Sequence, residues 1–244
     1  MTLLRLVHQC AEMLQTIELE RDRAYRELRS LVVGGAFAYD EALSERALAA
    51  RFGLSRTPMR EAVRRLVTEG LLTSLPARGV FVRRMDEREL TELYEVRLAV
   101  EGMAARLAAA KASKDDVSTM RATMALVDQG SDVQTIQDVG WTFHRQIFSA
   151  AGNAQLAAIY ESIVNRIIVA MRMTLRHDPA RVRRTVAEHL AIFRAIEARN
   201  AAGAELAMRE HLTGALTSRL SIADTLSDPP SGSHPYQTVE PIGE

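Results

Sequence analysis

Apolar residues recur at helical spacing along most of the chain. The first periodic segment, TIELERDRAYRELRSLVVGGAF at 16–37, predicts a helix that ends at Gly34-Gly35 and places on one face Ile17, Tyr25, Leu28, Leu31 and Val32. A short second helix is predicted in LSERALAARFG, with Ser44 as its N-cap. Residues 1–15 precede the periodic pattern and are treated as an N-terminal extension.

A third helix is predicted in SRTPMREAVRRLVTEG at 55–70. Ser55 is a suitable N-cap, and Pro58 falls in the first turn, where its missing N–H has no cost. The positions that follow the i, i+3, i+4, i+7, i+8 pattern of a buried face are Met59, Ala62, Val63, Leu66 and Val67. The opposite face carries Thr57, Arg60, Glu61 and Arg64, with Arg56 at its boundary.

The remainder of the pattern divides the chain into two domains. LLTSL and GVFVRR, separated by PARG, predict a hairpin that completes a domain at 16–84. From Asp86 onward about six helices are expected, at 86–111, 114–128, 132–150, 154–177, 179–199 and 203–225. The tail at 226–244 is rich in Pro, Ser and Gly, and we expect it to be disordered. The predicted fold is mostly α, with an all-helical domain at 86–225.

Composition narrows the class of protein. Of the 244 residues, 47% are hydrophobic and 5% are aromatic, which is typical of a helical core. The single Cys10 excludes an intramolecular disulfide and favours a reducing cytoplasm. The opening MTLLRLVHQCAEML is a poor signal peptide, and no run of 18 apolar residues occurs, so no membrane partner is expected.

Charge is unevenly distributed along a chain of zero net charge. Residues 16–84 hold 13 Arg and 9 acidic residues, a balance of +4 that the remainder offsets. This asymmetry is a weak indication of a polyanionic partner of the first domain.

Two short helices joined by FGLS and followed by a hairpin predict a winged helix-turn-helix. Arginine at the start of a recognition helix suits both phosphate contact and bidentate bonding to guanine, so Arg56 and Arg60 are the residues expected in the major groove. Arg64 and Arg65, further along, fit phosphate contacts or solvated charge. The alternative is that all these arginines form a solvated helix face.

The segment LSERALAARFGLSRTPMREAVRRLVTEGLLTSLPARGVFV resembles the DNA-binding domain of GntR-type bacterial transcriptional regulators. The resemblance implies DNA-contacting roles for Arg46, Arg56, Thr57 and Arg60, and a wing-tip position for Gly79. One departure is visible: the family's usual Pro-Gly before the second helix is Tyr39-Asp40 here. Because that turn lies away from the DNA contacts, we expect it to alter only local geometry.

The second domain resembles the helical ligand-binding domain of the FadR-like (FCD) branch, through LYEVRLAVEGMAARLAA, FHRQIFSAAGN and EHLAIFRAIEARNAAGAELAMREHL. The resemblance implies a divalent metal of the Zn or Ni/Mn class, held by one Asp and three His beside a small carboxylate effector. The histidines correspond to His144, His189 and His211, but the position of the aspartate is Gly140. Asp138 lies six residues before His144, about 120° from it round a regular helix, and cannot simply replace the aspartate.

Arg97 is the candidate effector-binding residue, because a guanidinium pairs bidentately with a carboxylate. The alternative is a surface ion pair with Glu101, one helical turn away.

Three functions compete. The favoured one is a ligand-responsive regulator that binds a palindromic operator as a homodimer and answers to a small organic acid. A metal-dependent enzyme built on the three histidines is disfavoured, because no nucleophile elbow, phosphate loop or His-Glu-x-x-His pair occurs. A DNA-coating architectural protein is disfavoured by the zero net charge. Whether the outcome is repression or activation stays open.

Overall fold

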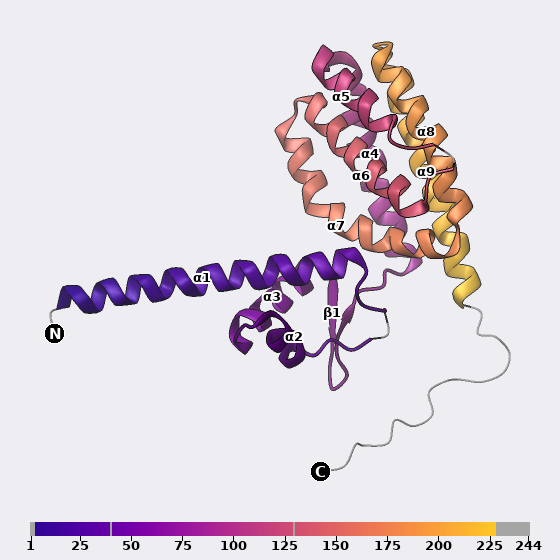
Figure 1. The fold of residues 1–244 in the computed structure, drawn as a ribbon. Coiled ribbons are helices and arrows are strands. Elements are labelled where there is room, and N and C mark those ends of the chain that lie inside the picture. The colour runs from indigo at the N-terminus through magenta and orange to yellow at the C-terminus, as the bar shows by residue number, and fades with distance from the viewer. Residues whose placement is uncertain (1–2, 40, 129, 228–244) are drawn as a thin grey trace.

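The computed structural model describes residues 3–39, 41–128 and 130–227. A small N-terminal domain that ends with β2 at Val82, the head, lies beside a helical bundle that begins with α4 at Glu87 (Figure 1). The head lies under the end of the bundle, and a long first helix extends away from both (Figure 1). This arrangement agrees with the mostly α, two-domain fold that the sequence predicted. The disordered tail predicted at 226–244 falls outside the described residues from position 228 onward.

The head consists of α1 (Leu3–Gly34), α2 (Glu45–Phe52), α3 (Arg56–Thr68), β1 (Leu72–Leu75) and β2 (Gly79–Val82). Helix α1 begins at Leu3, whereas the sequence pattern placed its start at Thr16. Most of the segment taken as an N-terminal extension is therefore the first part of this helix. Residues 3–15 contain neither Gly nor Pro, so the helix continues through them although they show no one-sided apolar pattern.

The caps of the two short helices differ from each other. The side chain of Ser44 accepts a hydrogen bond from the backbone N–H of Ala47 at 3.3 Å, as expected for an N-cap. Gly53 ends α2 with a φ of 62°, in the left-handed region that favours glycine. Ser55 is the N-cap residue of α3, as predicted, although its side chain makes no capping hydrogen bond. Pro58 is buried in the first turn of α3.

The wing is the predicted hairpin. Strands β1 and β2 pair antiparallel from Leu72↔Val82 to Leu75↔Gly79, and the loop before α2 adds a bridge between Leu43 and Val80. The buried face of α3 packs with α1 and this hairpin in one hydrophobic core, which includes Leu28, Val32, Met59, Leu66, Leu72 and Val82. The helix-turn-helix and its wing thus form a single packed unit.

The bundle contains α4 (Glu87–Lys111), α5 (Lys114–Met124), α6 (Val133–Ala151), α7 (Ala154–His177), α8 (Pro179–Glu197) and α9 (Ala201–Ser227). All six predicted helices are confirmed, with ends that move by a few residues. Helix α5 ends at Met124 instead of 128, because Asp128 organises a turn by accepting the backbone N–H of Gly130 at 2.8 Å. Helix α4 starts with a capping box between Asp86 and Glu89.

The bundle core brings α4 into close contact with α6 and α9. Small buried residues on α4, among them Ala104, Ala105, Ala108 and Ala109, let the neighbouring helices approach. One segment of α7, Ala154–Met171, has the length and the mean hydropathy, 1.2, of a membrane span. Its apolar side chains, including Tyr160 and Ile167, pack in the bundle core, so this segment is a core helix.

Candidate functional site

The predicted DNA-contacting residues are all exposed on the head. Arg56, Thr57 and Arg60 stand at the start of α3, Arg46 stands on α2, and Gly79 opens β2; all five are exposed. Within the part of the chain that the structure describes, none of the three arginines has a hydrogen bond or an ion pair. Their charges are therefore available to an external anion.

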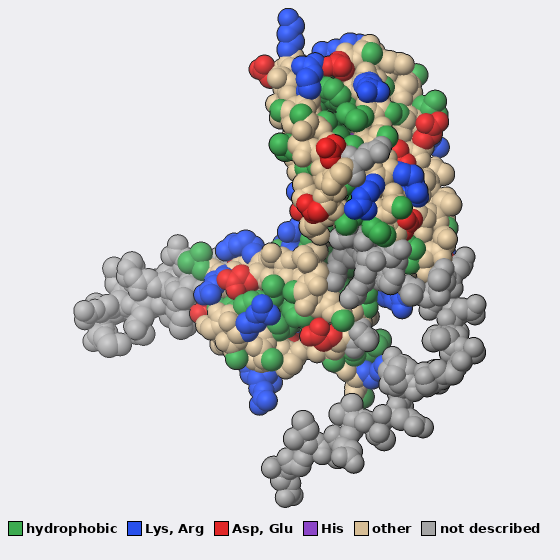
Figure 2. All heavy atoms as spheres, turned by 45° about the vertical axis from the view of Figure 1, so that its right-hand side comes forward, with side chains coloured by type: hydrophobic (Ala, Val, Ile, Leu, Met, Phe, Trp, Pro, Cys, Tyr) green, Lys and Arg blue, Asp and Glu red, His purple; other side chains and the backbone are tan. Residues whose placement is uncertain are grey.

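Some other arginines of the head have partners. Arg65 pairs with Glu69 at 3.2 Å and stacks over the ring of Tyr25, with 3.5 Å from its guanidinium carbon to the ring centre. The stacking on Tyr25 makes Arg65 part of the packing between α3 and α1. The sequence had suggested instead a phosphate contact or a solvated charge. Figure 2 shows a basic side chain projecting from the lower edge of the head, and acidic and basic side chains are mixed over the visible faces of both the head and the bundle.

The wing tip depends on two unusual backbone positions. Gly79, with a φ of 107°, pairs with Leu75 across a three-residue turn. Ala77 within that turn has a φ of 59°, a region that residues with a Cβ rarely adopt. The wing therefore presents glycine where its backbone is least encumbered by side chains, at the exposed end of the hairpin.

The three predicted histidines meet inside the bundle. His144 comes from α6, His189 from α8 and His211 from α9, and each is at most 6% exposed. One ring nitrogen of each lies within 4.8 Å of the others, and the Nε2 atoms of His144 and His189 are 3.2 Å apart. They line a cavity of about 50 Å³ together with Arg97, Arg181 and the turn of α6 around Gly140. Residues 67 positions apart in the sequence thus form one cluster of ligand atoms.

Two glutamates orient two of the imidazoles. The Oε2 atom of Glu101 lies 2.5 Å from Nδ1 of His144, and the Oε2 atom of Glu188 lies 2.7 Å from Nδ1 of His211. A carboxylate that accepts a hydrogen bond from Nδ1–H of a neutral imidazole leaves Nε2 as the electron-pair donor. Both carboxylates thereby fix the orientation of their rings, with Nε2 turned toward the other imidazoles of the cluster.

Each glutamate is in turn held by a buried arginine. The Nε atom of Arg97 donates to Glu101 at 2.6 Å, and Arg181 donates two bonds of 2.8 Å to Glu188. The pair predicted as an alternative for Arg97 does form, but Arg97 is 2% and Glu101 is 0% exposed, so it is not a surface pair. The Nη1 atom of Arg97 is buried without a hydrogen-bond partner, which leaves a donor available at the cavity.

Sequence inspection did not identify Glu101, Arg181 or Glu188 as parts of this centre. One signal was available: Glu188 precedes His189 and lies two helical turns after Arg181, so all three fall on neighbouring faces of α8. The pairing of Glu101 with His144, by contrast, joins two helices and has no local signature.

Burial controls the electrostatics of the centre. Burial lowers the pKa of His189 and His211 well below the usual value, and neighbouring positive charge lowers them further. Burial alone would raise the pKa of Glu101, but Arg97 and His144 outweigh it and lower the value to about 2. Burial raises the pKa of Glu188 despite its bonds to Arg181. At neutral pH the centre therefore offers neutral His189 and His211 beside an ionised Glu101.

Gly140 provides the local test of whether a metal fits. A Cβ atom at this position would lie 2.8 Å from Cε1 of His189, so the imidazole ring occupies the space in which an aspartate side chain would begin. Asp138 is exposed on the other side of α6, which agrees with its exclusion as a substitute. Tetrahedral Zn²⁺ with bonds of about 2.0–2.1 Å needs nitrogens roughly 3.3 Å apart, close to the spacing of His144 and His189. The donor set fits three-nitrogen coordination with open positions.

The chain matches two protein families in succession. Residues 20–82 match the bacterial regulatory proteins of the gntR family, and residues 92–214 match the FCD domain. The first match covers the head with its exposed arginines, and the second covers the bundle with its three histidines.

Individual proteins agree with this division. A probable D-xylose utilization operon transcriptional repressor of Paenarthrobacter nicotinovorans is 33% identical over 174 residues, 70% of this chain and 76% of its own length. The gluconate operon transcriptional repressor of Bacillus licheniformis is 28% identical, over 71% and 74% of the two chains. The solved structure of E. coli McbR/YncC has the same fold, with a TM-score of 0.69 over 86% of this chain and 99% of its own, at 22% identity.

Proposed function

Because the chain belongs to the GntR family of bacterial regulatory proteins and carries an FCD domain, we propose that it is a ligand-responsive regulator that binds a palindromic operator as a homodimer. Proteins of this family are transcriptional regulators and not enzymes. The homodimer, the palindromic operator, the class of effector and the residues that bind DNA, metal and effector go beyond family membership and are part of this proposal. It also places the protein in the cytoplasm, with its operator.

The exposed charges of the head carry the proposal. Arg46, Arg56 and Arg60 have no partner among the described residues, whereas Arg65 on the same helix as the latter two is paired and stacked. Unpaired arginines at the start of a recognition helix fit phosphate and guanine contacts, and Thr57 adds a hydroxyl beside them. Gly79 lets the wing backbone approach the adjacent groove. Arg64, further along α3, is also exposed and its side chain has no partner among the described residues, so it fits a phosphate contact or a solvated charge.

The bundle supports a role for a divalent metal and an acid effector. His144, His189 and His211 would hold the metal, and Glu101 and Glu188 would keep two of the imidazoles in the ligating tautomer. A bound divalent ion would supply a Lewis-acidic position for an anionic oxygen. The cavity of about 50 Å³ favours a short acid of few non-hydrogen atoms.

Arg97 is the proposed effector anchor, because its Nη1 atom is a buried donor without a partner beside the histidines. Arg97→Lys keeps a cation for Glu101 but removes the planar fork of donors. A thermal-shift screen should include short carboxylic acids, gluconate and D-xylose, since two similar proteins are named for gluconate and D-xylose operons. Isothermal titration of the best acid should then show weaker binding to Arg97→Lys, and unchanged affinity would reject the role.

The dimer follows from the size of one head, which reads only half of a two-fold site. Helix α4 offers exposed apolar side chains two turns apart at Val96 and Met103, as an interface would require. Sedimentation equilibrium should give twice the mass of one chain. A monomer at micromolar concentration, with and without DNA, would reject the dimer.

The decisive experiment is footprinting on the protein's own upstream region over a range of salt. A single protected palindrome, with half-sites about one helical turn apart, supports the proposed regulator. Uniform coating that vanishes with salt would indicate non-specific binding only, and no protection would reject this DNA as the operator.

A further inference from the structure

We propose that Tyr39 is a positioning residue that fixes the DNA-binding head on helix α7 of the bundle, and so links the orientation of the head to the effector cavity. Its hydroxyl donates a hydrogen bond of 2.7 Å to the backbone oxygen of Val169. Tyr39 stands where the GntR-type pattern has the proline of Pro-Gly, which has no hydroxyl to donate. The sequence predicted only local consequences for this departure, whereas the structure places it at a contact between domains.

Helix α7 enters the head at this point. The side chain of Val169 is 3% exposed and belongs to the hydrophobic core of the head, although its helix belongs to the bundle. One turn earlier, Arg29 of α1 donates a bond of 2.5 Å to the amide oxygen of Asn165. Helices α1 and α7 form the main helix-to-helix contact between the domains. Two head side chains, Tyr39 and Arg29, thus donate hydrogen bonds to α7 within about one turn.

The same stretch of α7 is also held from the bundle side. The Nε atom of Arg219, which is 3% exposed on α9, donates to the backbone oxygen of Ala170 at 3.1 Å. Two successive carbonyls of α7 therefore receive side-chain donors, one from the head and one from the bundle. A helix fixed on both sides passes a displacement from one to the other, since packed helices move as rigid bodies.

The link continues to the effector cavity through the next residue. Met171 lines the cavity of the three histidines, and its sulfur accepts a hydrogen bond of 3.0 Å from the hydroxyl of Tyr94. The guanidinium of Arg97 lies over the ring of Tyr94, 4.6 Å from its centre. A ligand bound to Arg97 is therefore connected to Met171 through Tyr94. Met171 follows Val169, whose carbonyl accepts the hydrogen bond from Tyr39, by two residues.

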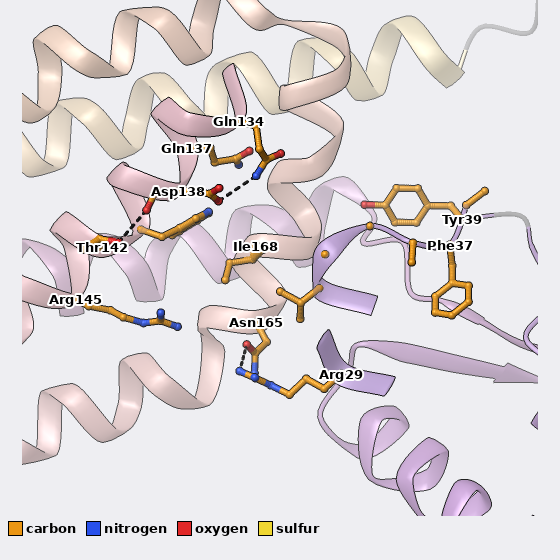
Figure 3. A pocket seen from close by; sticks show the side chains of 16 residues that line it. Arg29, Phe37, Tyr39, Gln134, Gln137, Asp138, Thr142, Arg145, Asn165 and Ile168 are labelled. Carbon is orange, nitrogen blue, oxygen red and sulfur yellow. Dashed lines mark hydrogen bonds between the residues drawn. The ribbon is translucent and has the colours of Figure 1, made fainter. Parts of the chain in front are cut away.

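An open groove lies beside the contact of Tyr39 with α7. It has a volume of about 670 Å³ and is lined by the loop of Phe37 and Tyr39 on one side and by α6 on the other. Figure 3 shows the Arg29–Asn165 hydrogen bond beside this groove. Gln137 and Trp141 of α6 line both this groove and the histidine cavity. Among the described residues, the direct contacts of the head with the bundle include those with α7 and the ion pair of Arg83 with Glu89 at the start of α4, so the contacts with α7 are a main determinant of its orientation.

The test compares Tyr39→Phe, which removes only the hydroxyl, with Tyr25→Phe, whose hydroxyl bonds to Glu69 within the head at 2.9 Å. Spin labels at Leu19→Cys and Leu126→Cys, both exposed, report the distance from head to bundle in a Cys10→Ser full-length chain. We expect a broader or shifted distance distribution for Tyr39→Phe at an unchanged melting temperature, and no change for Tyr25→Phe. A Tyr39→Phe distribution identical to that of the parent chain would overturn the proposal.

A DNA readout separates this proposal from the proposed function. Operator affinity is measured by fluorescence anisotropy with Zn²⁺ or with a chelator. We expect Tyr39→Phe to change operator affinity by about twofold to tenfold, the range that one hydrogen bond supplies, without changing binding to unrelated DNA. Equal affinities for the parent chain and Tyr39→Phe in both conditions would overturn the link to DNA binding. If the parent chain binds no operator at all, the proposed function fails, while the distance measurement still decides whether Tyr39 positions the head.

Discussion

The arginines of the two candidate sites, in the head and in the bundle, differ in exposure and in pairing. On α3 and α2 the candidate DNA-contacting arginines are exposed and have no partner among the described residues. In the bundle Arg97 and Arg181 are buried, and each is held by a glutamate that orients a histidine. Unpaired exposed charge is suited to an external polyanion, whereas buried charge must be balanced where it lies. The same residue type therefore marks a binding face in one domain and the internal support of a ligand centre in the other.

Removing the exposed charges should give the largest effect. Arg56→Ala combined with Arg60→Ala should weaken operator binding by about 30-fold or more, since each arginine–guanine pair contributes roughly 1–3 kcal/mol of discrimination. The control removes two exposed bundle arginines, Arg88→Ala with Arg184→Ala, which changes the net charge equally. Anisotropy on the footprinted fragment measures both variants. Similar losses for the two would mean that net charge and not the recognition helix controls binding, which would break the comparison.

Removing one imidazole should give the next largest effect, and in the bundle alone. Zn²⁺ at 100 times its dissociation constant should stabilise the parent chain by about 2.7 kcal/mol, and His211→Gln should lose this stabilisation. Thr185→Ser, which lines the same cavity without an imidazole, serves as the control. Urea unfolding with Zn²⁺ or a chelator, together with metal analysis of untagged protein, measures the difference. A parent chain without stoichiometric metal or chelator sensitivity would remove the metal from the proposal.

The two regions also differ in how much the sequence could predict. The head is encoded in one continuous stretch, so its helices, its hairpin and the exposure of Arg56 and Arg60 follow from local periodicity and turn residues. In the bundle the helices were predicted with ends correct to a few residues. The hydrogen bond from His144 to Glu101 was not, because it depends on how α6 packs on α4.

Contacts between the domains were the least predictable. Tyr39 looked like a local change in a turn, and only the docking of α7 shows that its hydroxyl reaches Val169. The start of α1 was also missed, since helix propensity without a one-sided apolar pattern leaves little trace in the sequence. Periodicity reports which face of a helix is buried, but it does not report which partner buries it.

A third prediction uses pH to separate the buried centre from the exposed face. Burial lowers the pKa of His189 and His211, so the unfolded chain binds more protons below pH 6.5 than the folded chain does. The stability of the metal-free protein should therefore fall as pH decreases from 6.5 to 5, by up to about 1.4 kcal/mol per pH unit for each imidazole. Glu101 adds only a small slope in the same direction near pH 5, because its pKa of about 2 keeps it ionised in the folded chain while the unfolded carboxyl titrates near 4.5.

The test of this pH dependence is urea unfolding of the parent chain and His189→Gln in the presence of a chelator. The variant should have a shallower dependence, by the contribution of one imidazole. The raised pKa of Glu188 acts in the opposite direction but is common to both proteins. Equal slopes would mean that His189 is protonated in the folded state, and the view of the centre as a set of neutral ligands would be wrong.

The smallest effect should come from the wing, where two residues of positive φ allow opposite substitutions to be compared. Gly79→Ala introduces a Cβ at a φ of 107° and should lower stability by about 1 kcal/mol and operator affinity severalfold, because the wing backbone no longer approaches the groove. Ala77→Gly, at a φ of 59°, should leave operator affinity unchanged and stabilise the chain by up to about 1 kcal/mol, since glycine adopts this region without strain. Thermal unfolding and anisotropy separate the two quantities. If Gly79→Ala lowered stability alone, the wing would support the head without touching DNA, and the binding face would be limited to the arginines of α2 and α3.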